Sequence, residues 1–163
     1  ADNIAIGLYT QQKSSLFDVV FRPQKSNQEV YEGVQQAMDM LCYFNPNLVE
    51  KRYELTKNIP HIDRRRIEIS RALVGSPSIL LLDEPTAGLN EEETMTMMKD
   101  IQKIKEKLSD ICIIIIEHDM QVMKEVPERI VVFNAGEKIS EGVYDDVVND
   151  PGVISAYLGG AEE

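Results

Sequence analysis

Two polar clusters that directly follow apolar runs are the strongest candidates for chemistry in this chain. The run 78–82 is followed by Asp83 and Glu84, and the run 112–116 is followed by polar residues that include His118. Ligands bind at the carboxyl ends of the strands in open α/β sheets. There an aspartate can hold Mg²⁺, a following glutamate can deprotonate water, and a histidine on the next strand can contact a terminal phosphate. One acidic pair would be an ordinary strand end, but two such ends favour a phosphate-handling site.

The two apolar runs must lie in one sheet for these clusters to meet. Neither run alternates between apolar and polar residues, so we expect both strands to be buried on both faces, as in a parallel sheet. A helix fits residues 91–108, and strand, helix and strand in this order form a right-handed parallel crossover. The other expected elements are helices at 2–8, 28–41, 48–54, 64–73 and 120–126, a loop or broken helix at 11–27, a hairpin at 130–140 and a short helical segment after residue 144.

The composition limits the class of protein. The chain has 163 residues and a net charge of −11, from 17 Lys and Arg against 28 Asp and Glu. This acidity argues against nucleic-acid binding and against docking on an anionic membrane surface. No apolar run reaches the length of a membrane-spanning helix, and the segment 1–10 lacks the pattern of a secretory signal. Cys42 and Cys112 stand alone in apolar surroundings, which predicts buried, reduced thiols.

Several longer motifs resemble one known family. The sequence L-L-L-D-E-P-T-A-G-L-N over residues 80–90 is similar to the Walker B motif and D-loop of ABC-transporter ATPases, and I-I-E-H-D-M over 115–120 resembles their switch-histidine segment. The sequence R-R-I-E-I-S-R-A-L over 65–73 resembles the helix behind their signature loop. The hairpin and the ending A-Y-L-G over 156–159 are most similar to the branched-chain amino-acid import subfamily. The resemblance implies an α/β fold of the P-loop NTPase type with a helical subdomain.

This resemblance implies a role for each matching residue. Asp83 would hold Mg²⁺, Glu84 would be the general base for water, and His118 would contact the γ-phosphate. The family often has Asp at the position of Asn90, and Asn keeps the hydrogen bonding without the charge. The residues that would form the D-loop, which crosses to a second copy of the subunit, are Ala87, Gly88, Leu89 and Asn90.

The chain departs from the family in two places. ATP binding in the family requires the P-loop G-x-x-x-x-G-K-[ST], and none of the nine glycines here is followed by Lys. The family's P-loop and Q-loop glutamine lie upstream of the position where Ala1 aligns, so we expect this chain to be the Walker B half and not to bind ATP alone. The signature position carries no glycine, which predicts a loop that is weak or inactive in contacting a phosphate on the partner subunit. That loop consists of Ile59 followed by the degenerate signature residues Pro60, His61, Ile62 and Asp63.

The arginines of the signature helix are open to a second interpretation. Arg64, Arg65 and Arg66 resemble a nucleic-acid-binding cluster, but with this net charge we interpret them as a solvated or ion-paired helix start. Asp63 and Glu68 are the expected acidic partners, since arginine at a helix N-terminus opposes the helix dipole. No spacing supports a metal site beyond the Mg²⁺ of a nucleotide, and no G-x-G-x-x-G supports a dinucleotide-binding fold.

We therefore expect residues 1–75 to form a helical subdomain with the signature-loop region, and residues 76–163 to form the Walker B half of the core with the C-terminal hairpin and helix. The resemblance implies the C-terminal part of an ATPase subunit that energises an importer of branched-chain amino acids, with ATP and Mg²⁺ as cofactors of the full-length protein. It also implies transmembrane permease subunits, a second ATP-binding subunit or homodimer, and a cytoplasmic, peripheral location on the membrane. The alternative is a truncated, non-catalytic interaction or dimerisation module.

Overall fold

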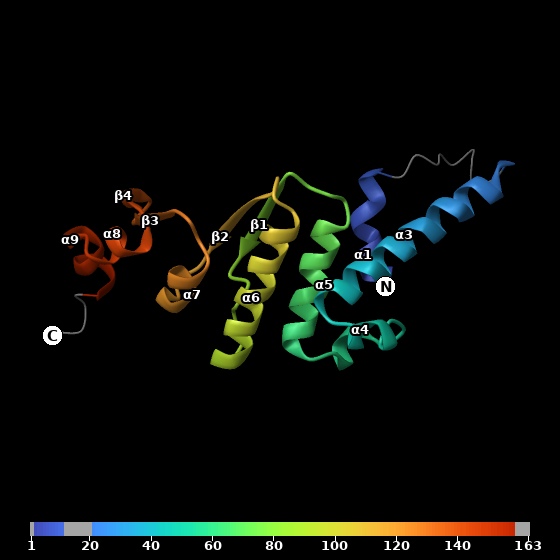
Figure 1. Ribbon diagram of the computed structural model, residues 1–163, viewed down its shortest axis with the longest axis horizontal. Helices are drawn as coiled ribbons and strands as arrows, with labels where there is room; N and C mark the ends of the chain where they lie inside the picture. Colours follow the sequence, from blue (N-terminus) through green and yellow to red (C-terminus); the bar gives the residue numbers. More distant parts are fainter. Residues whose placement is uncertain (1, 12–20, 159–163) are drawn as a thin grey trace. The chain divides into compact units, whose positions relative to one another are not determined.

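The computed structural model describes residues 2–11 and 21–158 of the chain (Figure 1). Backbone contacts divide the chain into two compact units, Ala1–Ile116 and Glu117–Glu163. The first unit contains a helical part and a parallel strand pair, and the second contains a hairpin with short helices. The functional division that we expect between residues 75 and 76 lies inside the first unit and stays a prediction.

Helices make up the first part of the first unit. Helix α3 (Pro23–Phe44) starts earlier than the expected residue 28 because Pro23 occupies its first turn, where proline's missing N–H costs nothing. It ends at Asn45, whose backbone N–H donates to the carbonyl of Leu41 at 2.9 Å, so the predicted break there is confirmed. The expected segment at 11–27 falls largely outside the described residues. The elements are α1 (Asp2–Ala5), the 3₁₀ helix η1 (Ile6–Gln11), α3 (Pro23–Phe44), α4 (Asn47–Glu50), the 3₁₀ helix η2 (Thr56–Asn58) and α5 (His61–Leu73).

A compact apolar cluster holds these helices together. Gly7 brings η1 directly against the backbone of α5, because a Cβ at Gly7 would lie 2.0 Å from the carbonyl oxygen of Arg71. Figure 1 shows α1, α3 and α5 side by side, in agreement with their contacts. The buried residues of the cluster are Ile4, Leu8, Ala37, Leu41, Leu48, Ile59 and Val74.

The second part of the first unit is a strand–helix–strand segment. Strand β1 (Ile79–Asp83) pairs in parallel with β2 (Cys112–Ile116), and helix α6 (Glu91–Lys107) connects them, which confirms the predicted order and the parallel pairing. Helix α6 begins with a complete capping box, in which the Asn90 side chain accepts from the backbone of Glu93 and the Glu93 side chain accepts from the backbone of Asn90.

The expectation that both faces of this sheet are buried is wrong. Leu80 and Leu82 are 2% and 9% exposed, whereas Leu81 between them is 70% exposed. The paired strand alternates between exposed and half-buried residues, so that one face of the two-stranded sheet is covered, fully along β1 and in part along β2, and the other is bare. In the described part of the chain neither strand has a second strand partner. The large apolar residues on the bare face are Ile79, Leu81, Ile114 and Ile116.

The second unit is built on the predicted antiparallel hairpin. Ala135 and Gly136 both have positive φ, at 48° and 84°, as the tight two-residue hairpin turn requires. The Tyr157 hydroxyl donates to the carbonyl of Phe133 at 2.6 Å and ties the last turn to the hairpin. The elements are α7 (Met120–Glu125), β3 (Ile130–Asn134), β4 (Glu137–Gly142), α8 (Tyr144–Val148), α9 (Pro151–Val153) and the π-helical turn η3 (Ile154–Leu158).

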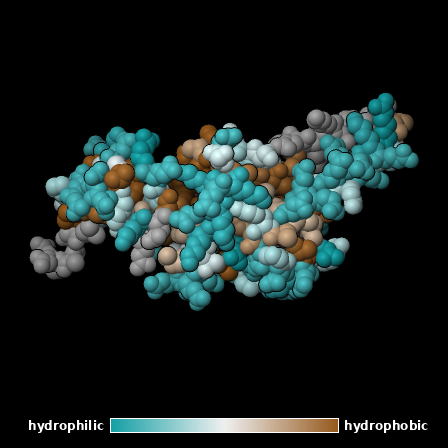
Figure 2. Space-filling view, in the orientation of Figure 1, coloured by the Kyte–Doolittle hydropathy of each residue, from teal (hydrophilic) through white to brown (hydrophobic). Residues whose placement is uncertain are grey.

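The surface agrees with the acidic composition. Hydrophilic residues dominate the face that Figure 2 shows, with apolar residues exposed in small groups between them. Cys42 and Cys112 are free and both are exposed, so the prediction of buried thiols is wrong. Within residues 2–11 and 21–158, no helix combines the length and the apolar character that a membrane span requires.

Candidate functional site

The first candidate residues stand at the carboxyl end of β1. Asp83 is the last residue of the strand and pairs with Ile116, the last residue of β2, so both strands end at the same edge. Glu84 follows in a left-handed conformation with φ of 44°, and its backbone N–H donates to the carbonyl of Ile116 at 2.9 Å. Both acidic residues are exposed. A left-handed non-glycine residue held in place at a strand end is typical of functional sites.

A tight turn joins Glu84 to α6. The amide of Ala87 donates to the carbonyl of Glu84 at 3.1 Å, and the amide of Leu89 donates to the carbonyl of Thr86 at 3.0 Å. Gly88 adopts φ of +77°, which favours glycine. The turn ends at the capping residue of α6, so the four residues at the D-loop position lie between two fixed elements.

The signature-position residues differ from expectation. We expect a loop through residue 63, but α5 starts at His61, with Pro60 as its N-cap and Asp63 in its first turn. The imidazole of His61 lies against Gly88, since a Cβ built on Gly88 would be 3.4 Å from Cε1 of His61. Ile62 is half-buried. The structure therefore brings the signature position and the D-loop position of the sequence together within one unit.

A buried ionic network anchors this start of α5. Asp63 and Asp100 are 7% and 3% exposed, and the guanidinium of Arg66 donates to both at 2.8 Å. Asn45 also donates to Asp63 at 3.3 Å, and Lys103 lies 3.4 Å from Asp100. Burial opposes the charge of Arg66, but its hydrogen bonds to Asp63 and Asp100 outweigh that effect and raise its pKa above the ordinary value. The predicted pairing with Asp63 is thus confirmed for Arg66, while its second partner, Asp100 of α6, was not predicted.

Another arginine of α5, Arg65, lines the same hollow as Asp83. A hollow of about 170 Å³ between α5 and β1 is lined on the helix side by Arg65 and Glu68, which form an ion pair at 2.9 Å. Asp83 and Pro85 line it on the strand side. Arg65 is not among the candidate site residues that the sequence indicates. Its spacing to Glu68 predicts the ion pair, but no local pattern relates either residue to Asp83, which lies on a different element.

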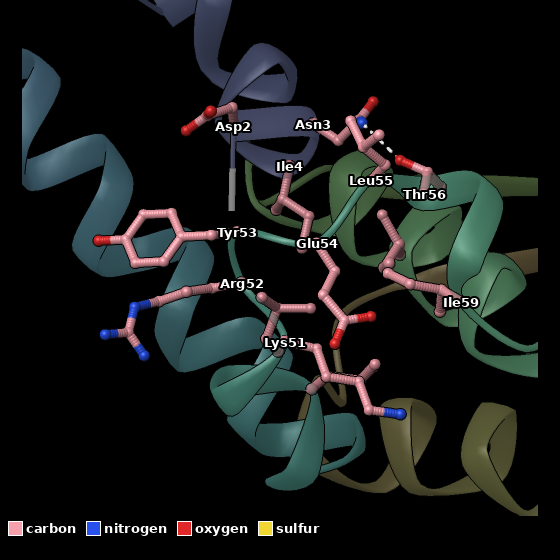
Figure 3. A pocket seen from close by; sticks show the side chains of 13 residues that line it. Asp2, Asn3, Ile4, Lys51, Arg52, Tyr53, Glu54, Leu55, Thr56 and Ile59 are labelled. Carbon is pink, nitrogen blue, oxygen red and sulfur yellow. Dashed lines mark hydrogen bonds between the residues drawn. The ribbon is translucent and has the colours of Figure 1, made fainter.

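A larger hollow lies away from the strand ends. It measures about 260 Å³ and is lined by α1, by Leu41 and Leu48, and by residues 51–56, 59 and 67 (Figure 3). Asn3 donates to the Thr56 hydroxyl at 3.2 Å at its edge, the bond that Figure 3 marks. Its lining mixes both signs of charge over an apolar floor, so it offers no acidic strand end and no convergent set of donors for phosphate.

His118 belongs to the second unit. It follows the last residue of β2 by two positions, precedes α7, and is exposed. This position, just after β2, is the one that the sequence predicts for it. Its role stays a prediction.

The described residues hold no group of three or more His, Cys, Asp or Glu side chains that is arranged to bind a metal ion. Mg²⁺ with a nucleotide requires less, because one or two carboxylates and the substrate phosphates complete its coordination. Asp83 at the strand end fits that requirement. The residues present therefore fit Mg²⁺ only together with phosphate oxygens.

The comparisons with known proteins agree with this fold. In solved structures, the chain matches MJ1267, an ATP-binding cassette of an ABC transporter, in its ADP conformation, with a TM-score of 0.74 and 22% identity over 96% of this chain and 61% of that chain. A second structure of MJ1267 matches with a TM-score of 0.68 and 25% identity over 77% of this chain and 50% of that chain. The fold is therefore that of part of an ABC ATPase domain.

Sequence comparison identifies which ABC ATP-binding proteins this chain is similar to. The chain is 33% identical over 160 residues to the high-affinity branched-chain amino acid transport ATP-binding protein LivG of Salmonella typhimurium, covering 98% of this chain and 62% of LivG. It is 29% identical to BraF of Pseudomonas aeruginosa over the same shares. A family described as "Branched-chain amino acid ATP-binding cassette transporter" matches residues 137–163. The chain is homologous to these ABC-transporter ATP-binding proteins over nearly its whole length, and it spans less than two thirds of their length.

Proposed function

We propose that this chain supplies the carboxylate-bearing part of an ATP-hydrolysing subunit that energises the import of branched-chain amino acids. The observation that carries the proposal is the parallel pair β1–β2, which places Asp83 and Glu84 at the edge where the second strand also ends. Homology to LivG and BraF over nearly the whole chain supports the transport class. In the whole subunit, we infer pairing with permease subunits and a second ATP-binding subunit at the inner face of the membrane.

The residues would divide the chemistry as follows. Mg²⁺ bound to ATP would supply charge neutralisation on the phosphates. Asp83 would hold that ion, and Glu84, one residue further on, would accept a proton from the attacking water. His118 would donate a hydrogen bond to the terminal phosphate. The turn residues 87–90 would meet the second subunit.

We further propose that this chain alone does not bind or hydrolyse ATP. Its sequence contains no P-loop to cradle the phosphates. The bare sheet face supports this, because parallel sheets are covered on both faces, and Leu81 and Ile116 are 70% and 62% exposed here. The curated relatives are longer than this chain, and we propose that in a longer form the additional length would cover that face.

Calorimetry with Mg-ATP tests both parts of the proposal. We expect no binding heat with this chain. In a longer form that also carries a P-loop, we expect binding that Asp83→Asn weakens at least about tenfold. Asp110→Asn is the matched control, since Asp110 is an exposed aspartate before β2, at the opposite end of the sheet. Tight binding by this chain alone would refute the second part, and a longer form that is insensitive to Asp83→Asn would refute the first.

The bare face also favours a second candidate function, a non-catalytic interaction module. In that case Leu81→Lys would abolish a self-association that sedimentation detects in the unmodified chain, and Glu84→Gln would leave hydrolysis by the longer form unchanged. If the ATPase proposal is correct, Glu84→Gln stops hydrolysis in the longer form while nucleotide binding persists.

A further inference from the structure

We propose that His61 is a positioning residue that holds the turn between β1 and α6. Its ring lies on the side of Gly88 from which a side chain would project. A Cβ there would lie 3.4 Å from Cε1, 3.8 Å from Nε2 and 3.9 Å from Nδ1 of the imidazole, which are ordinary van der Waals distances. The ring therefore borders, from a different element, the space that a Cβ at this position would take.

Hydrogen bonds hold the first turn of α5, which carries His61. The amide of Arg64 donates to the carbonyl of Pro60 at 3.0 Å and closes the first turn of α5 around His61. Two residues further on, Asp63 is bound by Arg66, which also binds Asp100 of α6 at 2.8 Å. These bonds fix the backbone position from which the exposed His61 side chain reaches Gly88.

The turn that His61 touches is the part of this segment that requires support. Glu84 at its start and Gly88 at its centre both have positive φ, and two backbone hydrogen bonds close it. Glu84 and Gly88 are exposed, whereas Pro85 and Thr86 between them are buried. Local opening costs least where the backbone is exposed, so in this turn it would begin around Gly88. A ring packed on the middle of the turn reduces that opening.

The functional consequence of this contact rests on the proposed function, in which residues 87–90 are the segment that would meet a second subunit. A glycine at the signature position brings backbone close to a phosphate. Here a histidine stands in that segment and contacts the neighbouring turn of the same chain. The segment would therefore act on the site through the geometry of the turn that begins at Glu84.

Amide hydrogen exchange of this chain tests the proposal without any nucleotide. In His61→Ala, the loss of several van der Waals contacts should speed exchange at the amides of Ala87 and Leu89 about threefold. His61→Phe keeps a planar ring and should restore slow exchange. Asn58→Ala, an exposed polar residue just before α5, is the matched control and should change neither amide.

A second measurement needs no substitution. The chain has two histidines, so their ring Hε1 signals are separable by nuclear magnetic resonance, and a cross-peak from His61 to the α protons of Gly88 is expected. Absence of that cross-peak, unchanged exchange in His61→Ala, or an increase spread evenly over the chain would each overturn the proposal. The calorimetry with ATP tests the proposed function, and its result does not depend on the exchange or cross-peak measurements. The two proposals are therefore tested separately.

Discussion

Replacing Arg66 by methionine tests how the start of α5 is held. The substitution leaves Asp63 and Asp100, at 7% and 3% exposure, without the guanidinium that contacts both at 2.8 Å. Removing one partner from a buried ionic network costs about 3–5 kcal/mol. Because Asn45 and Lys103 still lie near the two carboxylates, we expect the lower limit, about 3 kcal/mol.

Urea denaturation followed by circular dichroism measures this loss. With a denaturant slope of about 2 kcal/mol/M, the midpoint of Arg66→Met should fall by about 1.5 M. Arg65→Met is the matched control on the same helix. Arg65 pairs with Glu68 three residues away at 2.9 Å, and Glu68 is half exposed, so its loss should cost under about 0.5 kcal/mol.

The two arginine variants together decide the outcome. Equal losses in Arg66→Met and Arg65→Met would refute the reasoning, because the buried network would then contribute no more than a largely exposed ion pair.

Three further predictions follow from other parts of the molecule. Leu80 is 2% exposed and Leu81 is 70% exposed, so Leu80→Ala should cost about 3 kcal/mol in urea denaturation and Leu81→Ala under about 0.5 kcal/mol. Gly7→Ala places a methyl group 2.0 Å from a backbone oxygen of α5 and should lower Tm by about 4–8 °C, from about 2 kcal/mol of overpacking. Hydrogen bonds from the Ser140 hydroxyl and a backbone amide lower the pKa of Asp150. Ser140→Ala should raise it, as a carbon-13 titration of the carboxyl would show.

For each of these three predictions, one result would contradict the reasoning. Equal losses at Leu80 and Leu81 would mean that the second sheet face is covered in solution. An unchanged Tm in Gly7→Ala would contradict the close approach of η1 and α5. The lowered pKa of Asp150 means that its contribution to stability is present at neutral pH and lost as the pH falls through the folded-state pKa. An unchanged pKa in Ser140→Ala would show that the hydroxyl does not cause the shift.

The sequence predicts the strand–helix–strand segment well because its signals are local. Each strand is a short apolar run, and α6 begins with Asn90 and Glu93 at capping-box spacing. The hairpin is likewise marked by its turn residues. These features depend on neighbours within a few positions, which a single sequence contains.

The start of α5 shows how a resemblance can outweigh a local signal. The family pattern suggested a loop through residue 63, but the helix starts at His61. Pro60 directly before the helix and Asp63 in its first turn are ordinary start signals. Weighing them would have placed the start correctly and put His61 on the first turn.

The burial of the sheet could not be predicted from periodicity alone. The run at 78–82 has the composition of a strand that is covered on both faces. In this two-stranded sheet, however, a helical layer covers only one face. The pairing of Arg66 with Asp100 was missed for a different reason. These residues are 34 positions apart on different helices, and helical periodicity relates residues only within one element.

Helix α5 links these observations, because it contacts the strand–turn–helix segment at two places. Arg66 binds Asp100 in α6, and His61 packs on Gly88 in the turn that leads into α6. Glu84 starts that same turn and is tied by its backbone to Ile116 at the end of β2. A shift of α5 would therefore move the turn and α6 together while the bond from Glu84 to β2 keeps the strand ends in register. Substitutions in α5 should accordingly alter the geometry around Glu84 before they disturb the sheet.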